Sequence, residues 1–258
     1  IHLDLTRTEQ PGGQYIAPYL ETLPRRLAAA VAQARADRRP TILAFGQGQC
    51  SLAMNRDLPA PQAGGFACGP NPAGPSDDTV LVARATDPDG RLRAVLVNYA
   101  CHPTTLAWEN RLISPDYPGP MRALVEQATG ARCAFLLGPC GDLGPRDGFV
   151  GDVEVVERNG RQLGYAALQA LEALPPPGTQ MEYVGHVVSG ATLGIWRHVP
   201  VAPAQRLARQ VCRFDQIVVE LPGRAMPTRE ELEGRLEEWA RQEAAAEASG
   251  DALGRRDA

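Results

Sequence analysis

The sequence predicts an α/β fold: a mixed sheet with a βαβ unit at about 92–137, flanked by helices, and a β-rich segment after residue 180. Two apolar runs, 94–99 and 133–137, enclose an amphipathic segment that Gly130 closes. This is the pattern of strand, crossover helix and strand. Before this unit, TVLVARA and RLRAVLVNY flank a Thr-Asp-Pro-Asp-Gly turn, which predicts an antiparallel hairpin.

The remaining elements follow from periodicity and from breaking residues. Apolar side chains at helical spacing predict helices over 15–38 and 153–174, the first kinked or interrupted by Pro24. Thr228 and Glu231 form a capping-box pattern that predicts a last helix. Further strands are expected at 1–7, 41–46, 181–193 and 212–222. The proline- and glycine-rich stretch 58–78 is interpreted as a surface loop.

Composition limits the class of protein. The 258 residues are 44% hydrophobic and 22% charged, as in ordinary globular proteins, and the net charge of −4 argues against nucleic acid as a partner. No apolar run approaches the roughly 20 residues of a transmembrane helix. The six cysteines lack CxxC spacing, which favours unpaired thiols over a disulfide framework. We expect one domain over 1–258, incomplete at both ends, with an α/β core at 1–174 and a β-rich segment and helix at 180–258.

Polar loops follow both strands of the βαβ unit. His102 lies after the first strand, and Asp142 lies in the glycine-rich loop after the second. A right-handed crossover brings the carboxyl ends of parallel strands to one sheet edge, where open α/β sheets commonly hold their sites. The sequence therefore predicts a site at this edge. Asp142 is its candidate catalytic residue, and Gly141 would allow a substrate to approach the backbone closely.

Two interpretations of these loops stay open. In one, His102 is a hydrogen-bonded histidine at a strand end, and Asp142 caps the amides of a tight turn. In the other, the imidazole is a metal ligand or an acid–base group, and Asp142 orients it or a water molecule. One histidine alone does not make a metal site.

Three more polar residues are candidates around the same unit. Asn98, at the end of the first strand, and Asp116, before the crossover helix, are predicted to bind substrate. Asp116 precedes Pro118, which suits a first helical turn, so N-capping is its alternative role. Arg111 would pair with Asp116 or bind an anionic or carbonyl group, and we assign it a catalytic role. No G-x-S-x-G, P-loop or HExxH pattern occurs.

Three segments carry a family resemblance: NYACHPTTL (98–106), RLISPDYPG (111–119) and FLLGPCGDLGP (135–145). Together with GQGQCSLAMNRD (46–57), they resemble the N-terminal catalytic domain of the neutral/alkaline ceramidases, in particular short bacterial relatives. The resemblance implies hydrolysis of the amide of a sphingolipid at an active-site zinc. It makes His102 the second zinc histidine, and it places a glutamate and a tyrosine ligand further downstream.

The chain departs from the family pattern in three places. The first histidine motif has its best counterpart in residues 6–11, where Arg7 and Glu9 replace both histidines, unless the motif lies before Ile1. Gly144 stands where classical members carry a serine, so hydrolysis would require a metal-activated water. The downstream glutamate and tyrosine would follow Ala258.

Two functions are therefore weighed. The first is a zinc-dependent hydrolase that cleaves an amide bond in a lipid-like or other small substrate, with little activity expected of these 258 residues alone. The alternative is a non-catalytic ceramidase-like homologue that acts as a binding or structural module.

Overall fold

The computed structural model describes residues 12–60, 65–107, 110–210, 215–220, 223 and 226–250. Contacts divide the chain into two compact units, Ile1–Arg206 and Leu207–Ala258, and each is considered by itself. The first unit contains both helices and strands, with strands β1 to β6 following one another between α1 and α2, and a four-stranded mixed sheet is its centre. The predicted α/β class is confirmed.

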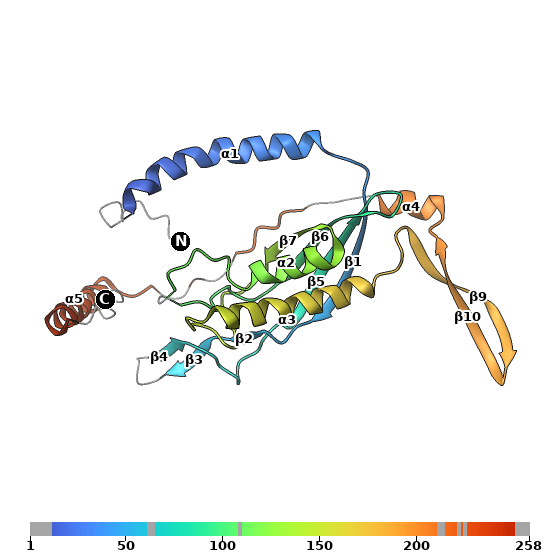
Figure 1. Ribbon diagram of the computed structural model, residues 1–258. Coiled ribbons are helices and arrows are strands. Elements are labelled where there is room, and N and C mark those ends of the chain that lie inside the picture. The colour runs from blue at the N-terminus through green and yellow to red at the C-terminus, as the bar shows by residue number, and fades with distance from the viewer. Residues whose placement is uncertain are drawn as a thin grey trace. The chain divides into compact units, whose positions relative to one another are not determined.

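The central sheet has the strand order β1-β5-β6-β7. β1 pairs antiparallel with β5, β5 antiparallel with β6, and β6 parallel with β7. The hairpin and the βαβ unit thus lie where the sequence predicted them (Figure 1). The bounds are β1 Ile42–Gln49, β5 Thr79–Thr86, β6 Leu92–Tyr99 and β7 Arg132–Leu137.

Two helices, α2 (Pro118–Thr129) and α3 (Val153–Glu172), cover one face of this sheet (Figure 1). Alternate strand residues point toward them, which gives the buried core the period of two that a half-covered sheet requires. The fully buried members of this core include Val80, Val95, Val97, Tyr99, Met121, Val125 and Leu163.

Glycines bring these layers close together. A Cβ atom at Gly160 of α3 would lie 2.5 Å from Pro120 Cγ and 2.7 Å from the Tyr117 carbonyl oxygen. On β1, a Cβ at Gly48 would lie 3.1 Å from the Ala166 carbonyl oxygen. Side chains at these positions would separate α3 from α2 and from the sheet, so the glycines set the spacing of the core.

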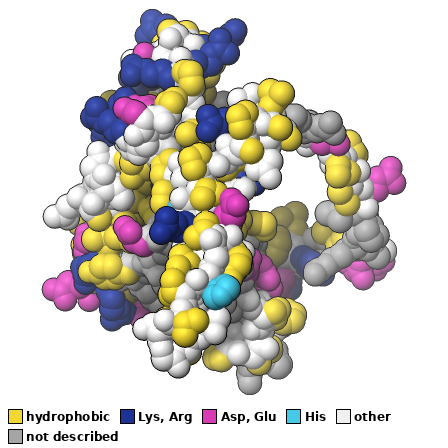
Figure 2. Space-filling model, turned by 90° about the vertical axis from the view of Figure 1, so that its right-hand side faces the viewer, with side chains coloured by type: hydrophobic (Ala, Val, Ile, Leu, Met, Phe, Trp, Pro, Cys, Tyr) yellow, Lys and Arg dark blue, Asp and Glu magenta, His cyan; other side chains and the backbone are white. Residues whose placement is uncertain are grey.

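The other face of the sheet carries exposed apolar side chains. Leu43 and Phe45 of β1 expose 55% and 74% of their surface, and Leu81 and Leu136 expose about half. On the side of the molecule drawn in Figure 2, hydrophobic side chains lie among polar and charged ones at the surface.

Shorter strands surround the sheet. β2 (Ala53–Asn55) pairs with β8 (Leu143–Pro145), and β3 (Asp57–Ala60) pairs with β4 (Gly65–Cys68). The interpretation of 58–78 as a loop is therefore wrong where β3 and β4 form. Beyond residue 178, β9 (Thr179–Ser189) and β10 (Ala191–Pro200) form the predicted β-rich segment as one long hairpin.

The N-terminal helix, α1 (Ile16–Ala36), follows a short 3₁₀ turn, η2 (Gly13–Tyr15), and runs through Pro24 without interruption. The predicted strand at 1–7 lies outside the described residues. Cys50, Cys68, Cys101, Cys133 and Cys140 are free thiols, as predicted for them, whereas Cys212 lies outside the described residues.

The C-terminal helix, α5 (Arg229–Ser249), begins at the predicted capping box. The Thr228 hydroxyl accepts from the Glu231 amide at 3.2 Å, and the Glu231 carboxylate accepts from the Thr228 amide at 2.7 Å. A short helix, α4 (Pro203–Arg209), precedes it. Residues 215–220 form no strand, which corrects the prediction for that part of 212–222. None of the helices over the described residues combines the length and apolar character needed to cross a bilayer.

Candidate functional site

The loops that follow β6 and β7 are joined by backbone hydrogen bonds. The Gly138 amide donates to the Tyr99 carbonyl at 3.0 Å, and the His102 amide donates to the Leu143 carbonyl at 3.1 Å. His102 and the 138–143 loop thus lie next to each other at the carboxyl edge of the parallel pair.

The loop that carries His102 is fixed on several sides. The Val150 amide donates to the Thr105 carbonyl at 2.8 Å, and the Asn159 side-chain amide of α3 donates to the Thr105 hydroxyl at 3.2 Å. The Tyr117 hydroxyl donates to the Cys101 carbonyl from the start of α2. Because Thr105, Asn159 and Tyr117 are buried, these bonds are shielded from water and hold His102 in place.

The His102 imidazole keeps one ring nitrogen unpaired. Its Nδ1 atom is buried and has no hydrogen-bond partner. Burial lowers the pKa of His102, and the positive charge of Arg56 lowers it further, against the opposing effect of Asp116. A lowered pKa favours the neutral ring at pH 7, in which one of the two nitrogens is unprotonated and has the lone pair that a metal ion or a proton would require.

Arg56 is the residue that the sequence analysis missed. Its Nε and Nη2 atoms donate to the Gly141 carbonyl at 3.1 and 2.9 Å, and its own amide donates to the Asp142 carbonyl at 2.8 Å. Arg56 therefore ties the glycine-rich loop to the end of β2 and brings positive charge to His102. The sequence offered one indication of Arg56, because the residue lies in the stretch 46–57 that contributes to the family resemblance. No chemical motif surrounds it.

The other predicted catalytic residues stand further apart. The Asp142 side chain is exposed, and no hydrogen bond joins it to His102; its contribution to the loop is the carbonyl that Arg56 engages. Arg111 is exposed. Asn98 is half-buried and donates from its side chain to the Leu136 carbonyl at 2.8 Å, across the β6–β7 pair. The Gly141 carbonyl is taken by Arg56.

Asp116 is buried, with 6% of its surface exposed, and both carboxylate oxygens accept backbone amides. Oδ1 accepts from Tyr117 at 2.7 Å and Oδ2 from Leu106 at 2.9 Å. The N-cap of α2 is Tyr117, without a side-chain cap, so the alternative role predicted for Asp116 is wrong. Its carboxylate instead fastens the loop after His102 to the start of α2.

Two residues other than glycine adopt left-handed backbone conformations beside this loop. Asp116 has φ 57° and bonds the Leu106 amide, whereas Phe149 has φ 56° and donates its amide to the Thr104 carbonyl at 2.9 Å. Such conformations are uncommon for aspartate and outliers for a bulky residue. They persist only where the surroundings impose them, as the bonds to 104–106 do here.

Gly144 has room for a Cβ atom. A Cβ atom there would lie 3.6 Å from Arg56 Cδ and 3.8 Å from Thr104 Oγ1, which are ordinary contacts. Packing at the Cβ position therefore does not by itself require a glycine here.

The described residues do not supply a zinc site by themselves. Nowhere among them do three His, Cys, Asp or Glu side chains come together as a metal centre. His102 is one candidate ligand, whereas active-site zinc normally has about three protein ligands. Arg7 and Glu9, the counterparts of the first histidine motif, lie outside the described residues.

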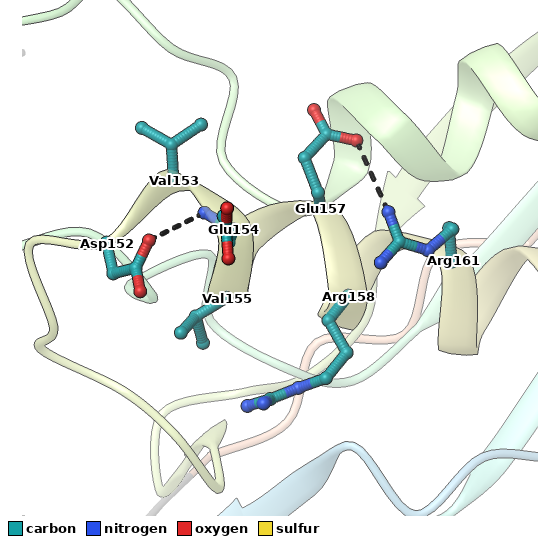
Figure 3. Close-up of a pocket in the computed structure, with 7 residues that line it drawn as sticks. All are labelled: Asp152, Val153, Glu154, Val155, Glu157, Arg158 and Arg161. Carbon is teal, nitrogen blue, oxygen red and sulfur yellow. Dashed lines mark hydrogen bonds and ion pairs between the residues drawn. The ribbon is translucent and has the colours of Figure 1, made fainter.

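A pocket at the start of α3 is separate from the His102 site (Figure 3). Most of its charged side chains have partners within the pocket or nearby. Asp152 accepts the Glu154 amide at 2.8 Å, Glu157 lies 4.0 Å from Arg161, and Arg158 pairs with Asp147. We therefore assign it no ligand.

Comparisons with known proteins find a partial likeness of structure. No protein-family model matches the chain, and no curated protein does. A neutral ceramidase from Pseudomonas aeruginosa is 19% identical, with a TM-score of 0.44 over 61% of this chain and 27% of its own. A structure described as ceramidase complexed with C2 is also 19% identical, with a TM-score of 0.45 over 63% and 29%. The chain thus spans less than a third of either protein, and this likeness assigns it neither family nor activity.

Proposed function

We propose that this chain carries part of the active site of a zinc-dependent hydrolase that cleaves an amide bond in a lipid-like or other small substrate. The observation that carries the proposal is His102, whose buried Nδ1 has no partner and whose pKa is lowered beside Arg56. Leaving a buried polar atom unsatisfied costs about 1–3 kcal/mol, so a ligand for it is expected. The sequence resemblance at 98–106 supports zinc as that ligand.

The residues of this chain would bind and orient the substrate. His102 would be one zinc ligand, and the metal, when bound, would supply a Lewis acid and an activated water. Since the described residues hold no second and third ligand, the remaining ones belong to residues 1–11 or to another segment. Arg56 would direct its positive charge at the carbonyl oxygen of the substrate; none of the carboxylates that the structure describes pairs with it.

A zinc titration tests this proposal. We expect one zinc per chain, lost in His102→Ala and retained in His198→Ala, a control on the exposed hairpin strand β10. Hydrolysis of N-acyl amines, measured by release of the free amine, should follow the zinc content. Zinc binding that is unchanged in His102→Ala would refute the assigned ligand.

The second candidate is the non-catalytic homologue, and the position of Arg56 favours it. A fixed positive charge close enough to lower the pKa of His102 also repels a metal cation at the same ring. In this alternative, the guanidinium replaces the ion and holds the loop through the Gly141 carbonyl.

The variant Arg56→Gln separates the two candidates. If the chain is a hydrolase, this change lowers kcat by about 10²-fold, as removal of a transition-state donor does, and zinc stays bound. If the chain is non-catalytic, the wild type binds no zinc and cleaves no amide, while Arg56→Gln gains zinc affinity. Circular dichroism would show that both proteins are folded.

A further inference from the structure

The segment 69–74, which follows β4, is bonded to the end of β2. The Gly69 amide donates to the Arg56 carbonyl at 2.9 Å, and the Asn71 amide donates to the Asn55 carbonyl at 2.8 Å. Asn55 is the last residue of β2, and Arg56 is the next residue along the chain. The same short segment therefore bonds the carbonyl groups of both.

The side chain of Asn71 adds hydrogen bonds at the same place. Its Nδ2 atom donates to the Asp57 carbonyl at 2.9 Å and to Asn55 Oδ1 at 3.3 Å, and its Oδ1 atom accepts the Ala73 amide at 3.1 Å. Asn55 Oδ1 also accepts the Asp57 amide at 3.0 Å. Because Asn55 is buried, the bonds to its side chain are partly shielded from water. Asn71 thus bonds the residues on both sides of Arg56.

Close packing reinforces these bonds. A Cβ atom at Gly74 would lie 2.4 Å from the Asn55 Cγ atom and 2.6 Å from the Asn55 Cβ atom, which is closer than two carbon atoms can pack. The Gly74 amide also donates to the Asn71 carbonyl at 3.1 Å. Glycine at position 74 therefore allows the segment to lie directly against Asn55.

These contacts fix the backbone from which the Arg56 side chain extends. β2 and β8 have three residues each, so their pairing alone supplies few hydrogen bonds. The Arg56 amide donates to the Asp142 carbonyl and the Arg56 carbonyl accepts the Gly69 amide, so both of its backbone groups are bonded. Its guanidinium then reaches the Gly141 carbonyl, in the loop next to His102. An arginine side chain has several rotatable bonds, so the guanidinium keeps one position more readily when the backbone behind it is fixed.

We propose that Asn71 is a positioning residue of the His102 site, because it holds the backbone that directs the Arg56 guanidinium to the glycine-rich loop. This inference rests on the proposed function for the role of Arg56, and it adds a residue that acts through Arg56. Without the two bonds that the Asn71 Nδ2 atom donates, the Arg56 backbone gains freedom. The guanidinium then leaves the Gly141 carbonyl for part of the time.

The variant Asn71→Asp tests the proposal, because a carboxylate still accepts the Ala73 amide but cannot donate to Asn55 or Asp57. NMR of protein with isotope-labelled arginine gives the rate at which the Arg56 Nε–H proton exchanges with water, and Arg56→Gln assigns this signal by its loss. We expect exchange about tenfold faster in Asn71→Asp than in the wild type, as the loss of one or two hydrogen bonds would cause. In the assay of N-acyl amine hydrolysis, kcat should fall toward that of Arg56→Gln, while KM and the zinc content stay unchanged.

A second variant and a matched control complete the experiment. Gly74→Ala displaces the Asn55 side chain without removing a donor, so it should accelerate exchange of the same Arg56 proton. Asn110→Asp removes a donor to the Leu112 carbonyl in another loop and should leave the Arg56 proton unchanged.

Unchanged exchange of the Arg56 proton in Asn71→Asp and Gly74→Ala overturns the proposal. Acceleration that extends to the amides of α3 also overturns it, because it would show a general loss of stability. Acceleration confined to the Arg56 proton, with no amide cleaved by the wild type, leaves the positioning role of Asn71 standing and refutes the proposed hydrolase.

Discussion

The helices α3 and α5 are similar in length and in how they begin, yet they serve different purposes. Asp152 caps α3 and Thr228 caps α5, each by accepting an amide of the first turn. Beyond the caps, α3 buries nine residues whereas α5 buries none. A strong capping signal therefore marks where a helix begins and carries no information on whether the helix packs.

The difference matters for the site because α3 reaches it. Gly160 lets α3 approach α2, and Asn159, one residue earlier, then donates to Thr105 beside His102. The helix that buries its surface thus also positions the loop. Substitutions along α3 should affect both stability and the site, whereas equivalent ones along α5 should remain local.

The largest effect is expected for Gly160→Ala. The added methyl group would lie 2.7 Å from the Tyr117 carbonyl oxygen and 2.9 Å from the Met121 nitrogen, and these backbone atoms can yield only if α2 moves. We expect a loss of about 3 kcal/mol in the free energy of unfolding, measured by urea denaturation.

Gly234→Ala in α5 is the matched comparison, since a Cβ there meets nothing within 4 Å. Alanine should favour this helix by up to about 1 kcal/mol, seen as unchanged or higher helicity by circular dichroism. Equal effects of the two substitutions would contradict the distinction between the helices.

Asn159→Ala should have the next largest effect. The change removes the bond to the buried Thr105 hydroxyl and leaves a small cavity, for a loss of about 2 kcal/mol. Hydrogen exchange should accelerate at the Val150 amide, which bonds the Thr105 carbonyl. Gln162→Ala, on the exposed side of α3, should leave that amide protected.

Much of the fold was predictable because it depends on local pattern. The apolar periods of β5, β6, α2 and α3 and the Thr228 capping box are properties of short segments. β3 and β4 were not predicted, since proline and glycine conceal their alternation. In α1, where a kink or an interruption was expected, the helix continues through Pro24 without interruption.

The site was less predictable because its contacts span long separations. The loops after β6 and β7 were predicted to be adjacent because connections between parallel strands are almost always right-handed, which is a general rule. Arg56, by contrast, reaches Gly141 across 85 positions through a flexible side chain that bonds a backbone carbonyl. Such a contact produces no periodicity. Asp116 was predicted to bind substrate, with capping of a helix as the alternative, and its carboxylate instead accepts the Leu106 and Tyr117 amides from a left-handed backbone conformation.

A smaller and local effect is expected for Thr228→Ala in α5. Loss of the Thr228 hydroxyl leaves the Glu231 amide without its acceptor and costs the helix about 1 kcal/mol. Amide exchange should accelerate over the first turn of α5, while the protection of α3 amides stays unchanged. Exchange that also accelerates in α3 would contradict the expectation of a local effect.

The smallest effect is the pH dependence that His102 imposes. Because burial and Arg56 lower the pKa of this ring below its ordinary value of 6.5, the unfolded chain binds the proton more tightly than the folded one. The contribution of the neutral His102 ring to the free energy of unfolding is therefore fully present above about pH 6.5. It is lost as the pH falls toward the lowered pKa of His102 in the folded state. The variant His102→Gln has no imidazole at this position and therefore lacks this pH-dependent contribution. The free energies of unfolding of wild type and variant, measured by urea denaturation, should therefore differ less at pH 5 than at pH 7.5. Thr104→Ser, which keeps the imidazole, should follow the wild type, and a difference that grows on acidification would mean that His102 gains its proton on folding.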